Sequence, residues 1–248
     1  MKIQILTFLL LVLAGVVNAQ TPEQMKMKPE MTEIWDPEIR VVTPGETPAN
    51  APSDAIVLFD GTNLNEWTNG KGEPAEWVVA DGCVTVKKGT GTMKTKRQFS
   101  DYQLHIEWRT PAEVVGESQG RGNSGIFMQG IYEVQVLDNY NNRTYRNGQA
   151  GSIYKQHPPL VNVCKAPGVW QKMKISFQAP RFDTAGKKII NAKMLKVELN
   201  GITLHENVEL LGPTRSSIAG EVPKGPLMFQ GDHGSVAFRN LVVKSFVR

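Results

Sequence analysis

The chain has 248 residues, with 28 basic and 24 acidic side chains and a formal net charge of +4 at pH 7. The basic residues are scattered and form no stripe interleaved with aromatic residues, which argues against a nucleic-acid partner. Only two cysteines are present, Cys83 and Cys164, so a disulfide-rich scaffold and a cysteine-rich metal site are excluded. Two states of these thiols are open, a disulfide in an oxidising compartment or a pair of buried free thiols.

Residues 1–19 predict a secretory signal peptide. Lys2 precedes an apolar run from Ile3 to Val17, and Ala19 is a small residue at the expected cleavage site. No later stretch approaches the roughly 18 consecutive apolar residues of a transmembrane helix. We therefore expect an exported protein, periplasmic or extracellular, without a transmembrane anchor.

Residues 20–53 predict an extended leader, because this stretch is rich in proline and shows no sustained period of 2 or 3.6 residues. The rest of the chain, residues 54–248, has the size of one sandwich or barrel domain with a substantial core.

Apolar or alternating segments recur along this domain, at residues 56–59, 76–79, 83–86, 102–109, 125–129, 132–137, 170–177, 194–199, 227–230 and 236–246. Turn signals such as Asp60-Gly61 and Asn200-Gly201 separate them, and helical periodicity is almost absent. The pattern predicts an all-β fold, a two-sheet antiparallel β-sandwich with jelly-roll connectivity.

The alternation also predicts which side chains share a face. In residues 102–108 the apolar set alternates with Gln103, His105 and Glu107. In residues 133–136 the valines are expected to point inward and Glu133 and Gln135 outward. If the outer surface of that sheet is concave, its polar groups form a groove that suits a sugar.

Two loops differ from ordinary turns. His157 precedes two prolines, which stiffen the loop. Asp232 and His233 lie on a glycine-flanked tip that runs from Gln230 to Ser235. For each loop two interpretations remain open, a turn without further role or a histidine that projects over the groove. His105 and His205 are expected on the surface.

Several motifs resemble the 3-keto-disaccharide hydrolase domain family over about residues 54–248. They are Leu58 to Trp67, Asn123-Ser124-Gly125-Ile126-Phe127, Tyr132 to Asp138, Pro167 to Gln171, Leu199-Asn200-Gly201 and Phe238-Arg239-Asn240-Leu241. The resemblance implies a concanavalin-like jelly roll exported by bacteria that degrade glycans. Two positions depart from the family pattern, which often has Gly where Ile131 stands and Glu where Val169 stands.

Residues 133–138 also resemble the Glu-x-Asp-x-x-Glu strand of laminarinases and lichenases. Gln135 stands where that motif has its middle acid, and the shorter Asp138 takes the place of the last one. A β-bulge is required to return Asp138 to the side of Glu133, because residues five apart on a regular strand point to opposite faces. These departures argue against a conventional two-carboxylate endoglucanase.

A 3-keto sugar requires less catalytic machinery, because its ketone acidifies the C2 proton and allows the C1 substituent to leave by elimination, with or without rehydration. Proton transfer requires a base and an acid, and the candidates are Glu133, His157 and His233. Candidate substrate contacts are Asn123, Gln135, Asp138, Tyr154, Lys155, Gln230, Asp232 and Arg239. No metal-ligand spacing is recognisable, so no cofactor is assigned, and polarisation of the ketone by a divalent ion stays open.

The leading hypothesis is therefore an exported enzyme, a glycoside hydrolase or lyase, whose partner is a small 3-keto-glycoside. A noncatalytic carbohydrate-binding module or lectin is the alternative, because the same fold and groove bind sugars without reaction. The sequence does not decide the oligomeric state.

Overall fold

Alternation in β6 (Tyr102–Arg109) sorts its side chains between the core and the outer surface. Tyr102, Leu104, Ile106 and Trp108 are buried, and the residues between them are partly exposed. Successive side chains of a strand point to opposite faces of the sheet, which explains this pattern. The predicted faces of this strand are confirmed.

The computed structural model describes residues 33–45, 51–214 and 220–246. The chain divides into two compact units, Met1–Val41 and Val42–Arg248. The described part of the first, residues 33–41, forms no strand or helix. Within the second unit the Ser53 backbone N–H donates to the Thr43 carbonyl at 3.0 Å. The predicted signal peptide lies outside the described residues, so its cleavage stays a prediction.

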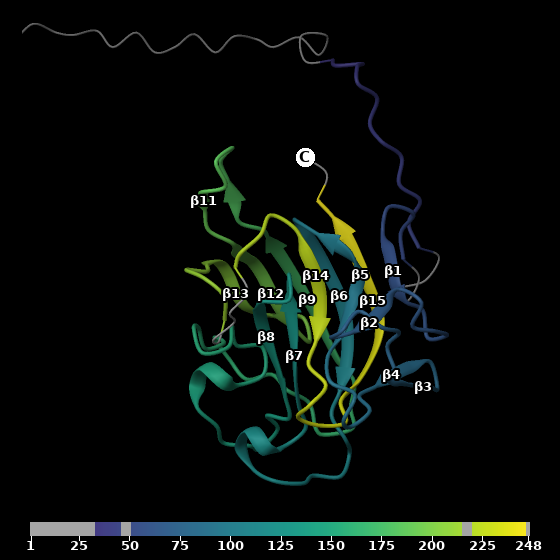
Figure 1. Ribbon diagram of the computed structural model, residues 1–248, viewed down its shortest axis with the longest axis vertical. Coiled ribbons are helices and arrows are strands. Elements are labelled where there is room, and N and C mark those ends of the chain that lie inside the picture. The colour runs from purple at the N-terminus through teal and green to yellow at the C-terminus, as the bar shows by residue number, and fades with distance from the viewer. Residues whose placement is uncertain (1–32, 46–50, 215–219, 247–248) are drawn as a thin grey trace, which may run out of the picture. The chain divides into compact units, whose positions relative to one another are not determined.

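Two antiparallel sheets make up the sandwich, and Figure 1 shows one in front of the other. The large sheet has the order β13 (Ile202–Glu209), β12 (Lys193–Leu199), β9 (Gln171–Gln178), β6, β15 (Ala237–Ser245), β4 (Cys83–Thr85) and β3 (Val78–Ala80), and β1 (Ile56–Phe59) pairs with β15. The small sheet has the order β2 (Trp67–Asn69), β5 (Met93–Phe99), β14 (Gly225–Phe229), β7 (Asn123–Met128) and β8 (Tyr132–Leu137). A separate hairpin joins β10 (Arg181–Phe182) to β11 (Lys188–Ile190).

The helical elements of the described residues are two 3-10 turns, η2 (Ser118–Gly120) and η3 (Arg146–Gly148). None of the described helices is long and apolar enough to cross a membrane. In the small sheet β14 lies between β5 and β7, so strands far apart in the sequence become neighbours, as in a jelly roll. The predicted all-β antiparallel sandwich is confirmed.

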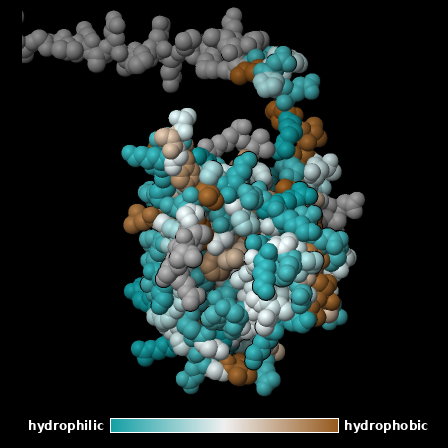
Figure 2. All heavy atoms as spheres, viewed as in Figure 1, coloured by the Kyte–Doolittle hydropathy of each residue, from teal (hydrophilic) through white to brown (hydrophobic). Residues whose placement is uncertain are grey.

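Stacked aromatic rings join the two sheets through the core. Trp67 and Phe229 of the small sheet lie 5.2 Å apart between ring centroids, and Phe229 stacks on Phe238 of the large sheet at 4.8 Å. All three side chains are buried. Such aromatic pairs stabilise the fold beyond the burial of their apolar area. They therefore fix the small sheet against the large one. The view in Figure 2 shows mostly hydrophilic residues, with hydrophobic ones in small, separate patches.

Some strands carry no clear signal in the sequence. The segments 56–59, 102–109 and 132–137 form strands with the predicted bounds. The strands β2, β5, β10, β11 and β13 are absent from the prediction. β5 carries Lys94, Lys96 and Arg97 among its seven residues, and these charges hide the alternation of a strand that has one solvated face.

The loop after β8 covers an edge of each sheet. The Gln135 N–H donates to the Ser152 carbonyl at 3.0 Å and the Tyr154 N–H to the Glu133 carbonyl at 3.1 Å, so residues 151–154 lie along β8. Farther on, the Leu160 N–H donates to the Leu204 carbonyl of β13 at 3.2 Å. The loop thereby satisfies backbone groups that an open sheet edge exposes.

His205 on β13 is buried by this loop, and its predicted surface position is wrong. Its side chain is 4% exposed, and its Nε2 lies 2.9 Å from the Gly151 carbonyl oxygen. Burial, together with the nearby His157, lowers the pKa of His205 below its ordinary value.

Candidate functional site

The candidate site lies on the face of β7 and β8 that is turned away from the core, which we call the site face. Val134 and Val136 of β8 are fully buried in the core, so Glu133 and Gln135 point the opposite way. In the register of the two strands, Gln135 is opposite Gly125 of β7. Sequence alternation predicts these directions correctly.

Glu133 and Gln135 point away from the core and are nevertheless buried. Their side chains are 2% and 1% exposed. Gln119 of η2 reaches over the strand, and its Oε1 lies 3.0 Å from the Gln135 side-chain amide, which Asn123 Oδ1 also approaches to 3.3 Å. Thr214 accepts the Glu133 N–H at 2.7 Å. Segments distant in the sequence therefore enclose the polar face.

Gly125 provides the space in which the Glu133 carboxylate lies. A Cβ atom on Gly125 would lie 2.5 Å from Glu133 Oε1 and 2.7 Å from the Phe127 ring. The orientation of the Gln135 amide that satisfies its hydrogen bonds turns its nitrogen toward Glu133, where it donates to Oε1 at 3.1 Å. The glycine thus lets a carboxylate lie flat on the sheet beside an amide.

A pair of tyrosines stands beside this carboxylate. The Tyr154 and Tyr145 hydroxyl oxygens are 2.6 Å apart, and Lys155 Nζ lies 3.7 Å from the centroid of the Tyr145 ring. Burial and the hydrogen bond with Tyr145 raise the pKa of Tyr154 to about 12, and the charge of Glu133 contributes to the rise. The Tyr154 phenol therefore keeps its proton at neutral pH.

Local backbone features hold the tyrosine pair in place. A Cβ on Gly148 would lie 2.0 Å from the Tyr145 ring, so only glycine admits the ring here. Lys155 adopts a left-handed conformation, with φ of 63°, and its N–H donates to the Asn147 carbonyl at 2.8 Å. Left-handed non-glycine residues carry strain and are frequent at functional sites.

Asp138 does not share the face of Glu133. The pairing of β7 with β8 runs from Tyr132 to Leu137 without a register shift, so the bulge that the glucanase-like motif requires is absent from this strand pair. The Asp138 carboxylate accepts a hydrogen bond from Arg121 Nε at 2.9 Å and forms an ion pair with the same guanidinium. The Asp138 carboxylate therefore holds the loop that carries Arg121.

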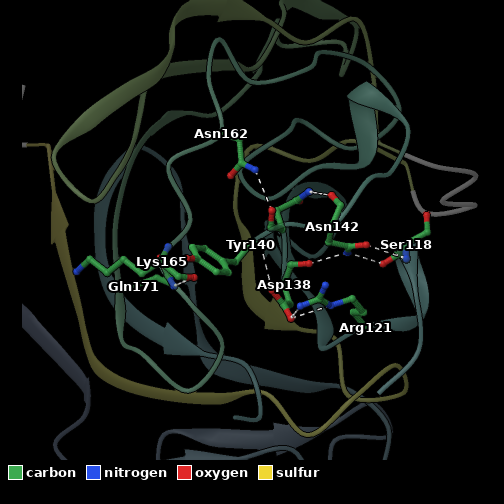
Figure 3. A network of polar contacts seen from close by, with 9 residues as sticks. Ser118, Arg121, Asp138, Tyr140, Asn142, Asn162, Lys165 and Gln171 are labelled. Atoms are coloured by element: carbon green, nitrogen blue, oxygen red, sulfur yellow. Dashed lines mark hydrogen bonds and ion pairs between the residues drawn. The ribbon is translucent and has the colours of Figure 1, made fainter. Parts of the chain in front are cut away.

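Figure 3 shows Asp138 at the centre of this anchoring network. Asn142 Nδ2 donates to the Asp138 carbonyl at 2.6 Å and to the Ser118 carbonyl at 3.0 Å. Asn162 Nδ2 donates to the Asn139 carbonyl at 2.9 Å. The network ties three loop segments together, including the one that positions Gln119 over the site face.

The two predicted catalytic histidines lie on separate loops. His157 follows the segment that runs along β8, and it lies near enough to His205 to affect its pKa. His233 is partly exposed, and its Nδ1 lies 2.6 Å from Asp232 Oδ1. Neighbouring Gly234 packs against the start of β7, because a Cβ there would lie 3.1 Å from the Asn123 backbone nitrogen. The tip therefore lies near the start of β7, and Asp232 and His233 line a pocket together with Val86 and Lys88.

Gln230 belongs with the site face, whereas Arg239 does not. The Gln230 N–H donates to the Gly125 carbonyl at 3.0 Å, which continues the pairing of β14 with β7. Arg239 lies on the outer face of the large sheet, where its Nε donates to Glu107 at 2.8 Å and its guanidinium stacks on the Trp170 ring. Of the predicted site residues, the structure thus brings together Asn123, Glu133, Gln135, Tyr154, Lys155 and Gln230.

Sequence reasoning missed Gln119, Tyr145 and Gly148. Gly148 ends a short Arg-Asn-Gly turn that the sequence shows only as a generic loop, and no periodic signal marks Gln119 or Tyr145. Within residues 33–45, 51–214 and 220–246, no group of three or more His, Cys, Asp or Glu side chains could hold a metal ion. Cys83 and Cys164 are free thiols.

Comparison with known proteins places the chain in a family. The profile of a family described as a 3-keto-alpha-glucoside-1,2-lyase-like domain matches residues 54–244. The crystal structure of a candidate glycosyl hydrolase from Parabacteroides distasonis is 45% identical, with a TM-score of 0.81, and the match covers 89% of this chain and 97% of that one. A second from the same bacterium is 21% identical, with a TM-score of 0.55 and coverage of 77% and 99%, and shows the fold alone.

No curated protein matches the chain. The family match spans well over half of the sequence and confirms the resemblance that its motifs predict. The chain therefore belongs to the 3-keto-alpha-glucoside-1,2-lyase-like domain family and is a carbohydrate-active enzyme of the glycosyl hydrolase or lyase type.

Proposed function

We propose that the site face binds a 3-keto-glycoside and cleaves it by elimination. A base takes the C2 proton, the electron pair forms an enolate on the C3 oxygen, and the C1 oxygen leaves with a proton from an acid. Water then adds to the new double bond, which gives net hydrolysis, or the elimination product departs. The description of the family as 3-keto-alpha-glucoside-1,2-lyase-like supports this substrate class.

One observation carries the proposal: the Glu133 carboxylate lies over Gly125, with an amide on one side and a protonated phenol nearby. A single carboxylate with donors around it suits proton abstraction next to a ketone. It does not suit the two-carboxylate mechanism, because Asp138 is engaged with Arg121.

In this proposal each group has a distinct role. Glu133 accepts the C2 proton, and Tyr154 donates a proton to the leaving oxygen. The amides of Gln135 and Asn123 donate hydrogen bonds to the enolate oxygen or to sugar hydroxyls. His157 and His233 stay predicted proton carriers, and export stays a prediction from residues 1–19.

The test is to incubate the purified protein with 3-keto-trehalose and a 3-keto-aryl-glucoside in D₂O and to follow the products by mass spectrometry. Elimination followed by rehydration incorporates deuterium at C2, and the parent sugars are expected to stay intact. Binding of unoxidised glycans without turnover of any oxidised sugar would instead identify a binding module.

Tyr154→Phe is expected to lower kcat about 100-fold for a poor leaving group, because the acid that protonates the departing oxygen is lost. An activated aryl leaving group departs without an acid, so its kcat should change little. The raised pKa, about 12 against an ordinary 10, keeps the phenol protonated below that pH. Wild type is therefore expected to show no loss of rate from this group between about pH 7 and 10.

Steady-state kinetics on both substrates checks this prediction. Tyr140→Phe is the matched control, since the Tyr140 side chain is exposed on the loop after β8. Equal losses with the poor and the activated leaving group would rule out the acid role.

A further inference from the structure

A groove lies on the outer face of the large sheet, which is a different surface from the site face. Its volume is about 600 Å³, within the range of ligand sites. It is lined by parts of β6, β9 and β15 and by the segment before β1, and its lining includes His105, Glu107, Lys172, Lys174, Asn240 and Lys244.

Positive charge predominates in this groove. Lys172 and Lys174 are exposed two residues apart on β9, so both point to the outer face. Glu107, which faces Lys172 across the strands, is engaged with Arg239 Nη2 at 2.7 Å. Glu198, which faces Lys174, is engaged with Lys196 at 3.1 Å. The nearby acids thus already have cationic partners.

The positive charge of the lysines also affects the His105 side chain, which lines the groove. His105 lies between Lys174 of β9 and Val242 of β15 in the sheet register. Burial lowers the pKa of His105, Lys174 and Lys244 lower it further, and Glu198 opposes them. The Lys244 ammonium lies 2.9 Å from Asp54, which ties the segment before β1 to the sheet as one wall of the groove.

The backbone beside the groove is irregular. The pairing of β15 with β6 shifts register between Arg239 and Val242. Asn240, within this bulge, is left-handed with φ of 53°. Bulges and strained non-glycine residues are concentrated near binding sites, because they redirect side chains at the cost of regular pairing. Asn240 and Val242, at this irregularity, both line the groove.

We propose that this groove binds an anionic polysaccharide, carboxylated or sulfated, and so holds the protein on a charged glycan while the site face reacts. Two exposed cations in a row on one strand match successive anionic groups of one chain, and the lysine stems offer apolar contact to sugar rings. The inference rests on the family's carbohydrate class and on the charge of the groove. It is independent of the 3-keto mechanism.

The test compares binding of polygalacturonate, a sulfated dextran, neutral dextran and duplex DNA to the full-length protein by isothermal titration calorimetry. Wild type is expected to bind at least one of the two charged polysaccharides, and which one it prefers identifies the anionic group. Lys172→Ala/Lys174→Ala should weaken that binding about 10-fold or more. Raising NaCl from about 50 to 500 mM should weaken it as well, because salt screens exposed charges.

The matched control is Lys96→Ala/Lys187→Ala, which removes two exposed lysines that do not line the groove. Its affinity for the charged polysaccharide should stay within about twofold of wild type. Both double variants should turn over a small 3-keto-glycoside at the wild-type rate. This separates failure of the groove from failure of the proposed reaction.

Three results would overturn the proposal. The first is that wild type binds neither charged polysaccharide, and the second is that the two double variants lose the same affinity. The third is that DNA or neutral dextran binds as tightly as the charged glycans. In that case the groove would be a general polyanion surface or a neutral sugar site.

Discussion

Glu133→Gln is expected to lower kcat on a 3-keto-glycoside about 1000-fold, with KM changed little. The amide keeps the shape of the side chain and one acceptor oxygen but cannot accept the C2 proton. The carboxylate lies in a closely fitted space over Gly125, where a Cβ atom would come within 2.5 Å of Oε1, so an isosteric change disturbs the surroundings least. Steady-state kinetics, together with NMR of C2 deuterium exchange, checks the result.

The matched control is Glu206→Gln, which neutralises an exposed carboxylate on β13. Glu133→Ala gives a second readout, since added formate should restore part of the activity if the lost group is a base. Continued C2 exchange at the wild-type rate in Glu133→Gln would contradict the proposed role. So would failure of formate to restore any activity in a variant that is folded by circular dichroism.

Arg121→Ala is expected to lower the free energy of unfolding by about 3–5 kcal/mol, because it leaves the Asp138 carboxylate buried without its cation. The side chains of Arg121 and Asp138 are only 11% and 4% exposed. The pair also joins the segment after η2 to the end of β8, so its loss should loosen the loops that enclose Glu133. Urea denaturation followed by tryptophan fluorescence measures the change.

Two further variants test the cause of that loss. Arg121→Leu/Asp138→Asn removes both charges and should recover much of the stability, since no uncompensated ion remains. Lys87→Ala breaks an exposed pair, 3.9 Å from Glu76, and should cost less than about 1 kcal/mol. A loss below about 1 kcal/mol in Arg121→Ala would show that the buried pair contributes little.

Alternation along the chain predicts much of the sandwich. The bounds of β6 and β8 and the inward direction of Val134 and Val136 agree with the sequence pattern. This works because side-chain direction on a strand is a local property with a period of two residues. The same pattern identifies Glu133 and Gln135 as the pair that points away from the core.

The position of Arg239 could not be predicted from the local sequence pattern. Its strand, β15, pairs with β6, whose residues lie more than a hundred positions earlier in the sequence. The sheet that a strand joins depends on such long-range pairing. Arg239, which the sequence suggests as a hydrogen-bond donor to the sugar, therefore lies on the outer face of the large sheet, away from the site face. The role of Asp138 is equally hard to predict from the sequence, because its ion-pair partner Arg121 belongs to a loop and not to a neighbouring strand.

Periodicity within each strand is enough to specify an all-β sandwich and to select Glu133 as the carboxylate of the candidate site. It leaves open what covers that carboxylate. Gln119, Tyr145 and Tyr154 reach Glu133 and its neighbours because an ion pair, a glycine and an added edge segment draw loops over β8. These contacts join residues far apart in the chain, and so only packing of the folded domain determines the chemistry around the acid.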